Sequence, residues 1–116
     1  MSDLNDLIIR YREFTHERDW QQFHDPRSLI LALVGEVGEL TELFQWPGPQ
    51  ITEASDNNSE LNRRASEEIA DVLLYLVRLS DVLNIDLLDV AHEKLSAAEQ
   101  RFPVHDFKGL APDKTK

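Results

Sequence analysis

Two pairs of acidic residues are the part of this sequence best suited to carry out chemistry. Glu36 and Glu39 form the first pair and Glu68 and Asp71 form the second, each with two residues between its members. In a helix this spacing places both carboxylates on one side, about 60° apart around the axis. If the two helices pack against each other, four carboxylates meet.

Four neighbouring carboxylates need a positive charge among them. Two like charges about 4 Å apart repel each other by about 4 kcal/mol at an effective dielectric constant of about 20. Oxygen ligands without cysteine favour Mg²⁺ or Mn²⁺ over zinc, and proteins often share Mg²⁺ between a few carboxylates and the phosphates of a substrate. The pattern therefore predicts a magnesium site, with manganese as the alternative metal.

Spacing alone leaves open a second interpretation, in which the acids are simply a solvated helix face. Their position favours a functional role. Both pairs are expected in the middle of a helix and beside apolar residues, whereas acids that serve only the helix prefer its first turn.

Composition limits the classes of protein that fit. A chain of 116 residues without cysteine predicts one domain, with neither disulfides nor a thiolate metal site, and is compatible with the cytoplasm. We assign this domain to residues 1–110 and a polar tail to 111–116. The N-terminus lacks an apolar signal core and no run approaches about 20 apolar residues, so we expect a soluble protein that does not bind membranes. A net charge of −10 argues against binding to nucleic acid.

Apolar periodicity predicts four helices, at about 3–19, 26–46, 60–83 and 87–102. Asp25 and Pro26 are expected at the N-cap and first position of the second helix, and Asp86 at the cap of the fourth. Pro103 is expected to end the fourth helix and to leave an extended or mobile segment after it. The polar stretch from 47 to 59 is expected to be an exposed loop.

The apolar stripes of these helices indicate more apolar surface than one chain can cover. The stripe of the second helix comprises Leu29, Ile30, Leu33, Val37, Leu40 and Phe44, and that of the third comprises Leu61, Ala65, Ile69, Val72, Leu76, Leu79 and Leu83. Because the third helix is apolar nearly all round from Val72 to Val77, we expect a partner subunit and at least a dimer. Gly35 and Gly38, which are unfavourable inside a helix, suggest that something approaches the backbone of the second helix closely on the carboxylate side.

The spacing of the acidic pairs also resembles the sequence motif of a known protein family. Glu-x-x-Glu, a gap of 28 residues and Glu-x-x-Asp is similar to the signature of the MazG-like all-α nucleoside triphosphate pyrophosphatases. Five further segments resemble the short dCTP pyrophosphatase branch of that family, namely 18–24, 31–40, 43–46, 67–76 and 101–104.

The resemblance implies a fold, an activity and a set of metal ligands. The implied fold is an all-α, four-helix MazG-like bundle that assembles into dimers or a dimer-of-dimers tetramer. The implied reaction is hydrolysis of a nucleoside triphosphate, dCTP first, to the monophosphate and pyrophosphate, with a housecleaning role. Mg²⁺ would be held by Glu36, Glu39, Glu68 and Asp71. Glu39 is the preferred general base and Glu36 the second catalytic candidate, because Glu39 lies further from the apolar stripe.

The resemblance also implies residues that bind the nucleotide. Trp20, Trp46 and Tyr75 are expected to form the base pocket, and His24 is a further candidate for substrate contact. The cations proposed for the phosphates are Arg18, Arg27, Arg101 and Lys108. Taken singly, each aromatic residue is equally compatible with a core or interface role, and each cation with an ordinary surface charge.

Three alternatives remain open at this stage. Within the same family, the substrate could instead be dUTP or phosphoribosyl-ATP. The chain could also be a non-catalytic helical interaction module. A ferritin-like di-iron bundle would need two Glu-x-x-His motifs, but Glu13 and His16 supply one and Asp89 and His92 only a partial second.

Overall fold

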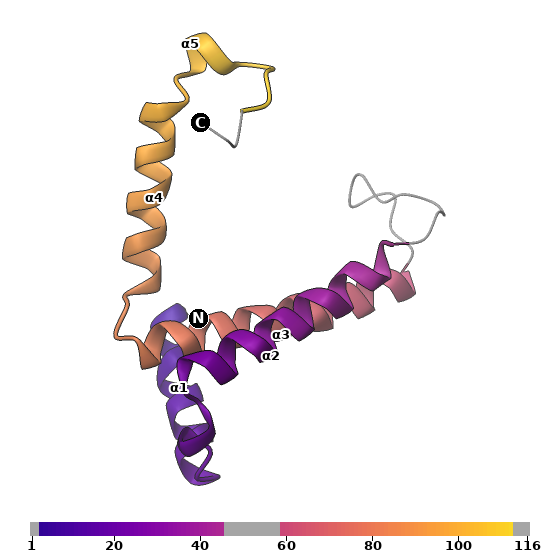
Figure 1. Ribbon diagram of the computed structural model, residues 1–116, viewed down its shortest axis with the longest axis vertical. Helices are drawn as coiled ribbons and strands as arrows, with labels where there is room; N and C mark the ends of the chain where they lie inside the picture. Colours follow the sequence, from indigo (N-terminus) through magenta and orange to yellow (C-terminus); the bar gives the residue numbers. More distant parts are fainter. Residues whose placement is uncertain (1–2, 46–58, 113–116) are drawn as a thin grey trace. The chain divides into compact units, whose positions relative to one another are not determined.

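The computed structural model describes residues 3–45 and 59–112, and the described residues form helices joined by turns and short connections, with no strand (Figure 1). The elements are α1 (Leu4–Glu17), the 3₁₀ turn η1 (Gln21–Phe23), α2 (Pro26–Leu43), α3 (Ser59–Val82), α4 (Leu87–Arg101) and α5 (Val104–Phe107). The predicted all-α class is therefore confirmed. Trp46, nearly all of the expected loop at 47–59 and the end of the tail lie outside the described residues.

Three aspartates begin three of these helices. Asp3 caps α1 by accepting a hydrogen bond from the Asp6 amide at 2.9 Å, and the Asp6 carboxylate accepts one in return from the Asp3 amide. Asp25 caps α2 through the Ser28 amide at 3.1 Å, with Pro26 at the first helical position. Asp86 caps α4 in the same way. Each carboxylate satisfies a backbone donor that the helix itself leaves free, and this confirms the predicted starts of α2 and α4.

The chain divides into two compact units, at residues 1–84 and 85–116. In the first unit α2 and α3 lie side by side and run in opposite directions, and α1 packs on α3 (Figure 1). The second unit contains α4 and α5, whose rings Phe102 and Phe107 meet edge to face with centroids 5.1 Å apart.

The expectation of an extended segment directly after Pro103 was wrong. Pro103 does end α4, but it then stands before the short helix α5 with extended backbone angles. Proline is compatible with a helix start because its missing N–H is not needed there. The packing of Phe107 on Phe102 gives this turn an apolar contact to form around.

Few apolar side chains are buried within this chain. Among the described residues the buried hydrophobic side chains are Leu29, Ala65 and Val77. The predicted core stripe of α2 is correct for Leu29 but wrong for Ile30, Val37 and Phe44, which are 45%, 44% and 52% exposed. The periodicity placed these residues on an apolar face correctly, but nothing in the described chain covers that part of it.

Both helices of the central pair carry a second, outward apolar face. On α2 this face contains Ile30, Leu31, Val34 and Val37, and on α3 it contains Ile69, Leu73 and Leu76. Leu31 and Val34 are 64% and 62% exposed. An uncovered apolar surface of this kind marks an interaction site in a folded protein.

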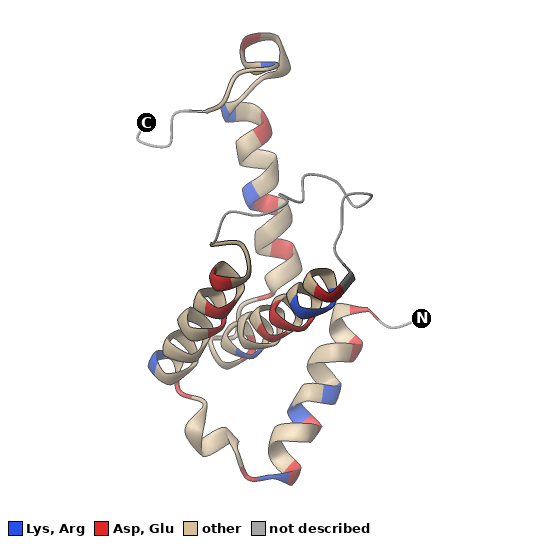
Figure 2. Cartoon of the chain, turned by 90° about the vertical axis from the view of Figure 1, so that its right-hand side faces the viewer, with Lys and Arg blue, Asp and Glu red and all other residues tan. Residues whose placement is uncertain are grey.

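No helix in the described part of the chain has the length and apolar content needed to cross a bilayer. Figure 2 shows both acidic and basic residues on α2 and α3, with the acidic residues in the majority.

Candidate active site

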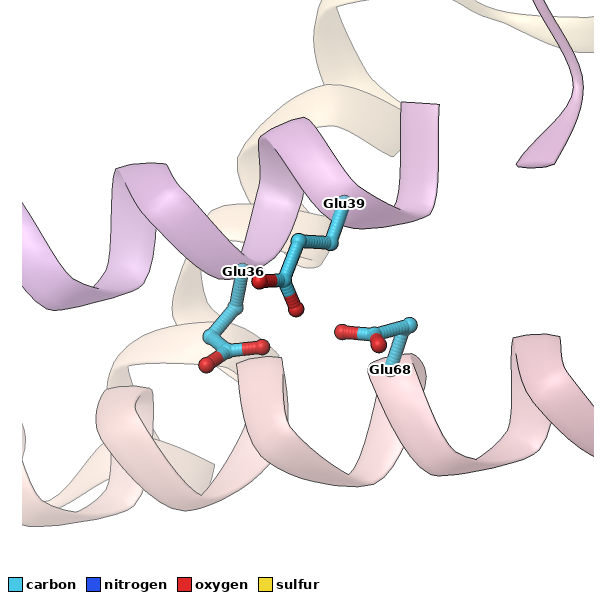
Figure 3. A group of neighbouring side chains, drawn as sticks. All are labelled: Glu36, Glu39 and Glu68. Carbon is cyan, nitrogen blue, oxygen red and sulfur yellow. The ribbon is translucent and has the colours of Figure 1, made fainter. Parts of the chain in front are cut away.

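Three glutamates from the two central helices come together in the first unit. One carboxylate oxygen from each of Glu36, Glu39 and Glu68 lies within 4.8 Å of the others. Figure 3 shows Glu36 and Glu39 reaching from α2 toward Glu68 on α3. The antiparallel packing of α2 on α3 produces this meeting, because the i, i+3 pair of one helix faces the middle of the other.

Asp71 is not part of this group of three oxygens. It lies about one turn further along α3 than Glu68 and is half-buried. Its negative charge still reaches the cluster, since it helps to raise the pKa of Glu36. The structure thus brings three of the four expected carboxylates together and leaves the role of Asp71 as a ligand a prediction.

The cluster contains buried oxygens that have no partner. Glu36 Oε2 and Glu68 Oε2 are buried, and neither has a hydrogen-bond partner in the described chain. Burial of the carboxylate, followed by the nearby charges of Glu39 and Asp71, raises the pKa of Glu36. Burial and the adjacent Glu36 and Glu39 raise the pKa of Glu68 to about 7. The fold therefore holds these carboxylates together against their mutual repulsion.

These features fit a hard divalent cation. A buried carboxylate oxygen normally finds a hydrogen bond or a metal, and here two such oxygens face a third carboxylate. The donor set is entirely carboxylate, which suits Mg²⁺ or Mn²⁺ better than zinc or a soft metal. Glu36, Glu39 and Glu68 are the residues that would hold the ion.

We predict that the metal-free protein loses stability through this cluster as the pH rises from about 4.5 to about 7. The folded-state pKa of Glu68 is about 7, above its ordinary value of 4.5, so within this window the folded protein keeps a proton that the unfolded chain releases. Stability falls with rising pH wherever the folded state binds more protons. Thermal unfolding in the presence of a chelator, measured for the parent and for Glu68→Gln, tests this.

The comparison between the two proteins isolates the effect of Glu68. Asp25, Glu60 and Asp81 have lowered pKa values, because each accepts hydrogen bonds in the folded state, and they give the opposite pH slope at lower pH. Glu68→Gln should therefore show a smaller stability decrease between about pH 4.5 and 7, and the raised pKa of Glu36 should account for the decrease that remains. Equal slopes in both proteins would contradict the assignment.

A polar pocket opens beside the glutamate cluster. It has a volume of about 820 Å³ and is lined, among the described residues, by Glu39, Glu42, Leu43, Gln45, Arg64 and Glu68. This volume lies within the range of about 300–1,000 Å³ that is usual for small-molecule sites. Arg64 is the one cation in the described lining. Arg64 was not predicted from the sequence as a site residue, although its position one turn before Glu68 on α3 is a signal for one.

A second group of polar residues lies where α1 and η1 meet α3. Tyr75 is half-buried on α3, one turn after Asp71. Burial is the main cause that raises the pKa of Tyr11, and electrostatic repulsion from Tyr75 and Asp71 adds to it. The positive charge of Arg78 works in the opposite direction. His24 is half-buried and accepts a hydrogen bond at Nδ1 from Arg78 Nε at 2.9 Å. Through Asp71, this group and the glutamate cluster share one electrostatic environment.

Tyr11 and Arg78 were not predicted from the sequence as site residues. Tyr11 lines an apolar pocket of about 300 Å³ together with Leu7, Arg10, Phe14 and Leu74. Arg78 could have been noticed, because it interrupts the apolar run of α3 and an arginine on such a face needs a partner.

Among the described residues of the first unit, the others expected to bind the substrate show no contact with the glutamate cluster. Trp20 packs edge to face on Phe14 with centroids 5.5 Å apart. The Arg18 guanidinium lies over the same ring, 3.9 Å from its centroid, and donates to the Phe14 carbonyl. Both contacts are local to the C-terminal end of α1. Arg27 is exposed in the first turn of α2. Arg101 and Lys108 belong to the second unit, and Trp46 lies outside the described residues, so their roles stay predictions.

The expected close approach to the backbone at Gly35 and Gly38 does not come from the described chain. A Cβ atom built on either residue would meet no heavy atom within 4 Å. The two glycines lie beside the outward apolar face of α2, which leaves open space there for atoms from outside the chain.

Comparison with known proteins defines the class of this chain. The MazG nucleotide pyrophosphohydrolase domain matches residues 24–105, a range that includes all four acidic residues. The chain therefore belongs to the MazG nucleotide pyrophosphohydrolase domain family.

The individual relatives confirm the resemblance found in the sequence. dCTP pyrophosphatase 1 of Rattus norvegicus is 46% identical over 113 residues, which cover 93% of this chain and 64% of the relative. dCTP pyrophosphatase 1 of Homo sapiens is 47% identical over 108 residues, which cover 88% of this chain and 60% of the relative. The chain thus spans less than two thirds of the length of these curated relatives.

The fold of this chain is similar to that of a solved structure over most of both chains. It is a pyrophosphatase from Archaeoglobus fulgidus that is 34% identical to this chain and superposes with a TM-score of 0.73. The similarity covers 89% of this chain and 94% of that one.

Proposed function

We propose that this protein is a magnesium-dependent nucleoside triphosphate pyrophosphatase that prefers dCTP or modified dCTP. The observation that supports this proposal most directly is the three-glutamate cluster, in which two buried carboxylate oxygens have no hydrogen-bond partner among the described residues. Membership of the MazG family and the similarity to proteins named dCTP pyrophosphatase 1 support the reaction and the substrate. The role we propose is removal of unwanted triphosphates from the nucleotide pool.

The reaction adds one water across the bond between the α- and β-phosphates and releases the monophosphate, pyrophosphate and a proton. A bound Mg²⁺ or Mn²⁺ would neutralise phosphate oxygens and help to orient the water. Glu36, Glu39 and Glu68 would hold the ion in this proposal, with Asp71 as the fourth ligand. Glu39 accepts the proton of the water, because it is the most exposed carboxylate of the cluster and solvent reaches it.

The nucleotide contacts follow from the residues around the cluster. Trp20, Trp46 and Tyr75 stack on or surround the base, and His24 contacts it. The triphosphate is held by cations, for which Arg18, Arg27, Arg101 and Lys108 are the proposed residues. Arg64 joins this set because it lines the polar pocket beside Glu39 and Glu68.

We also propose that the active form is a homo-oligomer, a dimer or a dimer of dimers, in which the helices complete a four-helix MazG-like bundle. The outward apolar faces of α2 and α3 support this. In this proposal residues 1–110 act as one domain with a short tail at 111–116, and the protein works in the cytoplasm without nucleic-acid or membrane partners.

A panel of nucleotides tests the function directly. We expect pyrophosphate release from dCTP to have a higher kcat/KM than release from dUTP, phosphoribosyl-ATP or purine triphosphates, and to require Mg²⁺ or Mn²⁺. A pocket that hydrogen-bonds cytosine rejects other bases, because they leave its buried polar groups unpaired. Clearly faster turnover of a purine triphosphate would overturn the choice of substrate. Absence of turnover for the entire panel would favour an interaction module.

Trp46→Ala tests the base pocket in the same assay. Stacking of a base on an aromatic ring contributes about 1–3 kcal/mol whatever the base, so the KM for dCTP should rise by about 5- to 150-fold. The KM values for the other nucleotides should rise by a similar factor, leaving the order of preference unchanged. An unchanged KM for dCTP would remove Trp46 from the pocket.

A further inference from the structure

The C-terminal half of α3 contains a buried cation that the acidic cluster does not require. Arg78 is 9% exposed and lies in an otherwise apolar stretch of the helix. A buried charge is tolerated only where it is paired and hydrogen-bonded. The partners of Arg78 therefore indicate what it is for.

Arg78 contacts residues from two other segments of the first unit. Its Nε donates to Nδ1 of His24 at 2.9 Å, and its Nη1 donates to Asp81 Oδ2 at 3.3 Å. Asp81 also accepts from Arg12 of α1, at 2.8 Å from Nε and 2.5 Å from Nη2. The network joins α1, the residue after η1 and α3.

The chemistry of these groups determines the form of His24. A guanidinium only donates hydrogen bonds and is always charged, so Nδ1 of His24 must be the acceptor. The neutral ring then carries its proton on Nε2. Protonation of Nδ1 would remove the hydrogen bond and place two cations together. Burial and the charge of Arg78 accordingly lower the pKa of His24.

We propose that Arg78 is a positioning residue that keeps His24 neutral, so that its Nε2–H donates to an uncharged acceptor on the substrate base. This proposal rests on the proposed function and assigns a recognition role within it. An uncharged donor suits the ring nitrogen or carbonyl oxygen of cytosine, whereas phosphates are better held by cations. Arg78 also lies on the same side of α3 as Asp71 and Tyr75, at spacings of seven and three residues, and the proposed function assigns both of these residues to the substrate site.

Other charged groups could influence His24 and must be considered. Asp81 and Arg12 act through Arg78, and Tyr11 of α1 interacts with Arg78 electrostatically. Asp25 and Arg27 follow His24 in the chain, but Asp25 is occupied in capping α2. Arg78 is the charged residue that bonds the ring itself.

Nitrogen and proton NMR of the histidine rings tests the form of His24 without substrate or metal. His24→Gln assigns its signals among the four histidines. We expect the parent to show the Nε2–H tautomer and a titration midpoint below the ordinary value of 6.5. In Arg78→Met the midpoint should move up toward that value and the Nδ1–H tautomer should become populated. An Nδ1–H tautomer in the parent, or an unchanged midpoint in Arg78→Met, would overturn the proposal.

Kinetics with dCTP then test the contact to the base. The KM should rise by about two- to tenfold in both His24→Ala and Arg78→Met, the range expected for one neutral hydrogen bond, with kcat nearly unchanged. Below about pH 6.5 the KM of Arg78→Met should rise further, since its His24 becomes charged, while the parent should not show this rise. A KM unchanged in His24→Ala would overturn the contact even if the tautomer is as expected.

Three further variants separate positioning from a purely structural role. Arg78→Lys keeps a charged donor and should retain the lowered midpoint and most of the affinity, and Arg78→Gln serves in place of Arg78→Met if that variant fails to fold. Arg63→Met removes an exposed arginine of the same helix, whose partners are Glu60 and Glu67, and should leave the His24 midpoint and the KM unchanged. Similar KM changes in Arg63→Met and Arg78→Met would indicate a general effect on α3 and overturn the proposal. The NMR result stands independently of turnover, so failure of the proposed reaction and failure of this proposal are distinguishable.

Discussion

Glu36→Gln is expected to abolish pyrophosphate release from dCTP while leaving the helices intact. The substitution keeps the size of the side chain and removes the charge of one ligand, and one of its oxygens is buried without a partner in the described chain. Loss of a residue that only supports a metal ligand lowers metal affinity or activity by about 10- to 100-fold. Loss of a ligand itself should therefore lower them by at least about 100-fold. Turnover at several Mg²⁺ concentrations and Mn²⁺ binding by calorimetry measure this.

The neighbouring acid Glu67 provides a matched control. It lies beside Glu68 but pairs with Arg63 at 2.6 Å on the exposed side of α3, so Glu67→Gln should keep both metal binding and activity. Circular dichroism should show equal helix content in all variants. Full activity of Glu36→Gln at low Mg²⁺ would rule out the cluster as the metal site.

Asp71→Asn addresses the acid that the structure leaves outside the three-oxygen group. If Asp71 is a ligand, this variant should lose Mn²⁺ affinity about as strongly as Glu36→Gln. An Asp71→Asn protein that binds Mn²⁺ like the parent would limit the site to the three clustered glutamates.

The meeting of Glu36, Glu39 and Glu68 could be predicted because it depends on local rules. Two i, i+3 pairs on consecutive helices, joined by a connection that lets the helices run antiparallel, bring their carboxylates together with no knowledge of the rest of the fold. The exact place of Asp71 depends on how far α3 is shifted along α2. That shift is determined by side-chain packing, which periodicity does not reveal.

Burial was predicted less well than helix position, for a related physical reason. Ile30 and Val37 were assigned to a core stripe because periodicity identifies an apolar face, but it does not say whether that face is covered by the same chain. The Arg78 to His24 bond was missed because its members are 54 positions apart in sequence. Such contacts arise only when η1 and α3 meet in space.

Val34→Glu is expected to convert the assembled protein to a monomer and to lower its stability. Val34 is 62% exposed on the outward face of α2, beside Leu31 at 64%, and nothing in the described chain covers either residue. Burial of one such side chain contributes about 1.5–3 kcal/mol, and a two-fold interface contains each residue twice. Loss of about 3–6 kcal/mol would weaken dimerisation by a factor of about 10² to 10⁴.

Sedimentation velocity at micromolar concentration, with thermal unfolding of the same samples, measures both effects. The control is Ser28→Glu, which introduces the same residue into the first turn of α2, where a negative charge is favourable; the Ser28 amide still donates to Asp25, and the Ser28 Oγ bond to Asp25 is lost. This control should sediment like the parent, and its melting temperature should depend on concentration as expected for an oligomer. A parent protein that is folded and monomeric at micromolar concentration would show that the outward faces of α2 and α3 are not subunit contacts, because their apolar residues would then be stable in water.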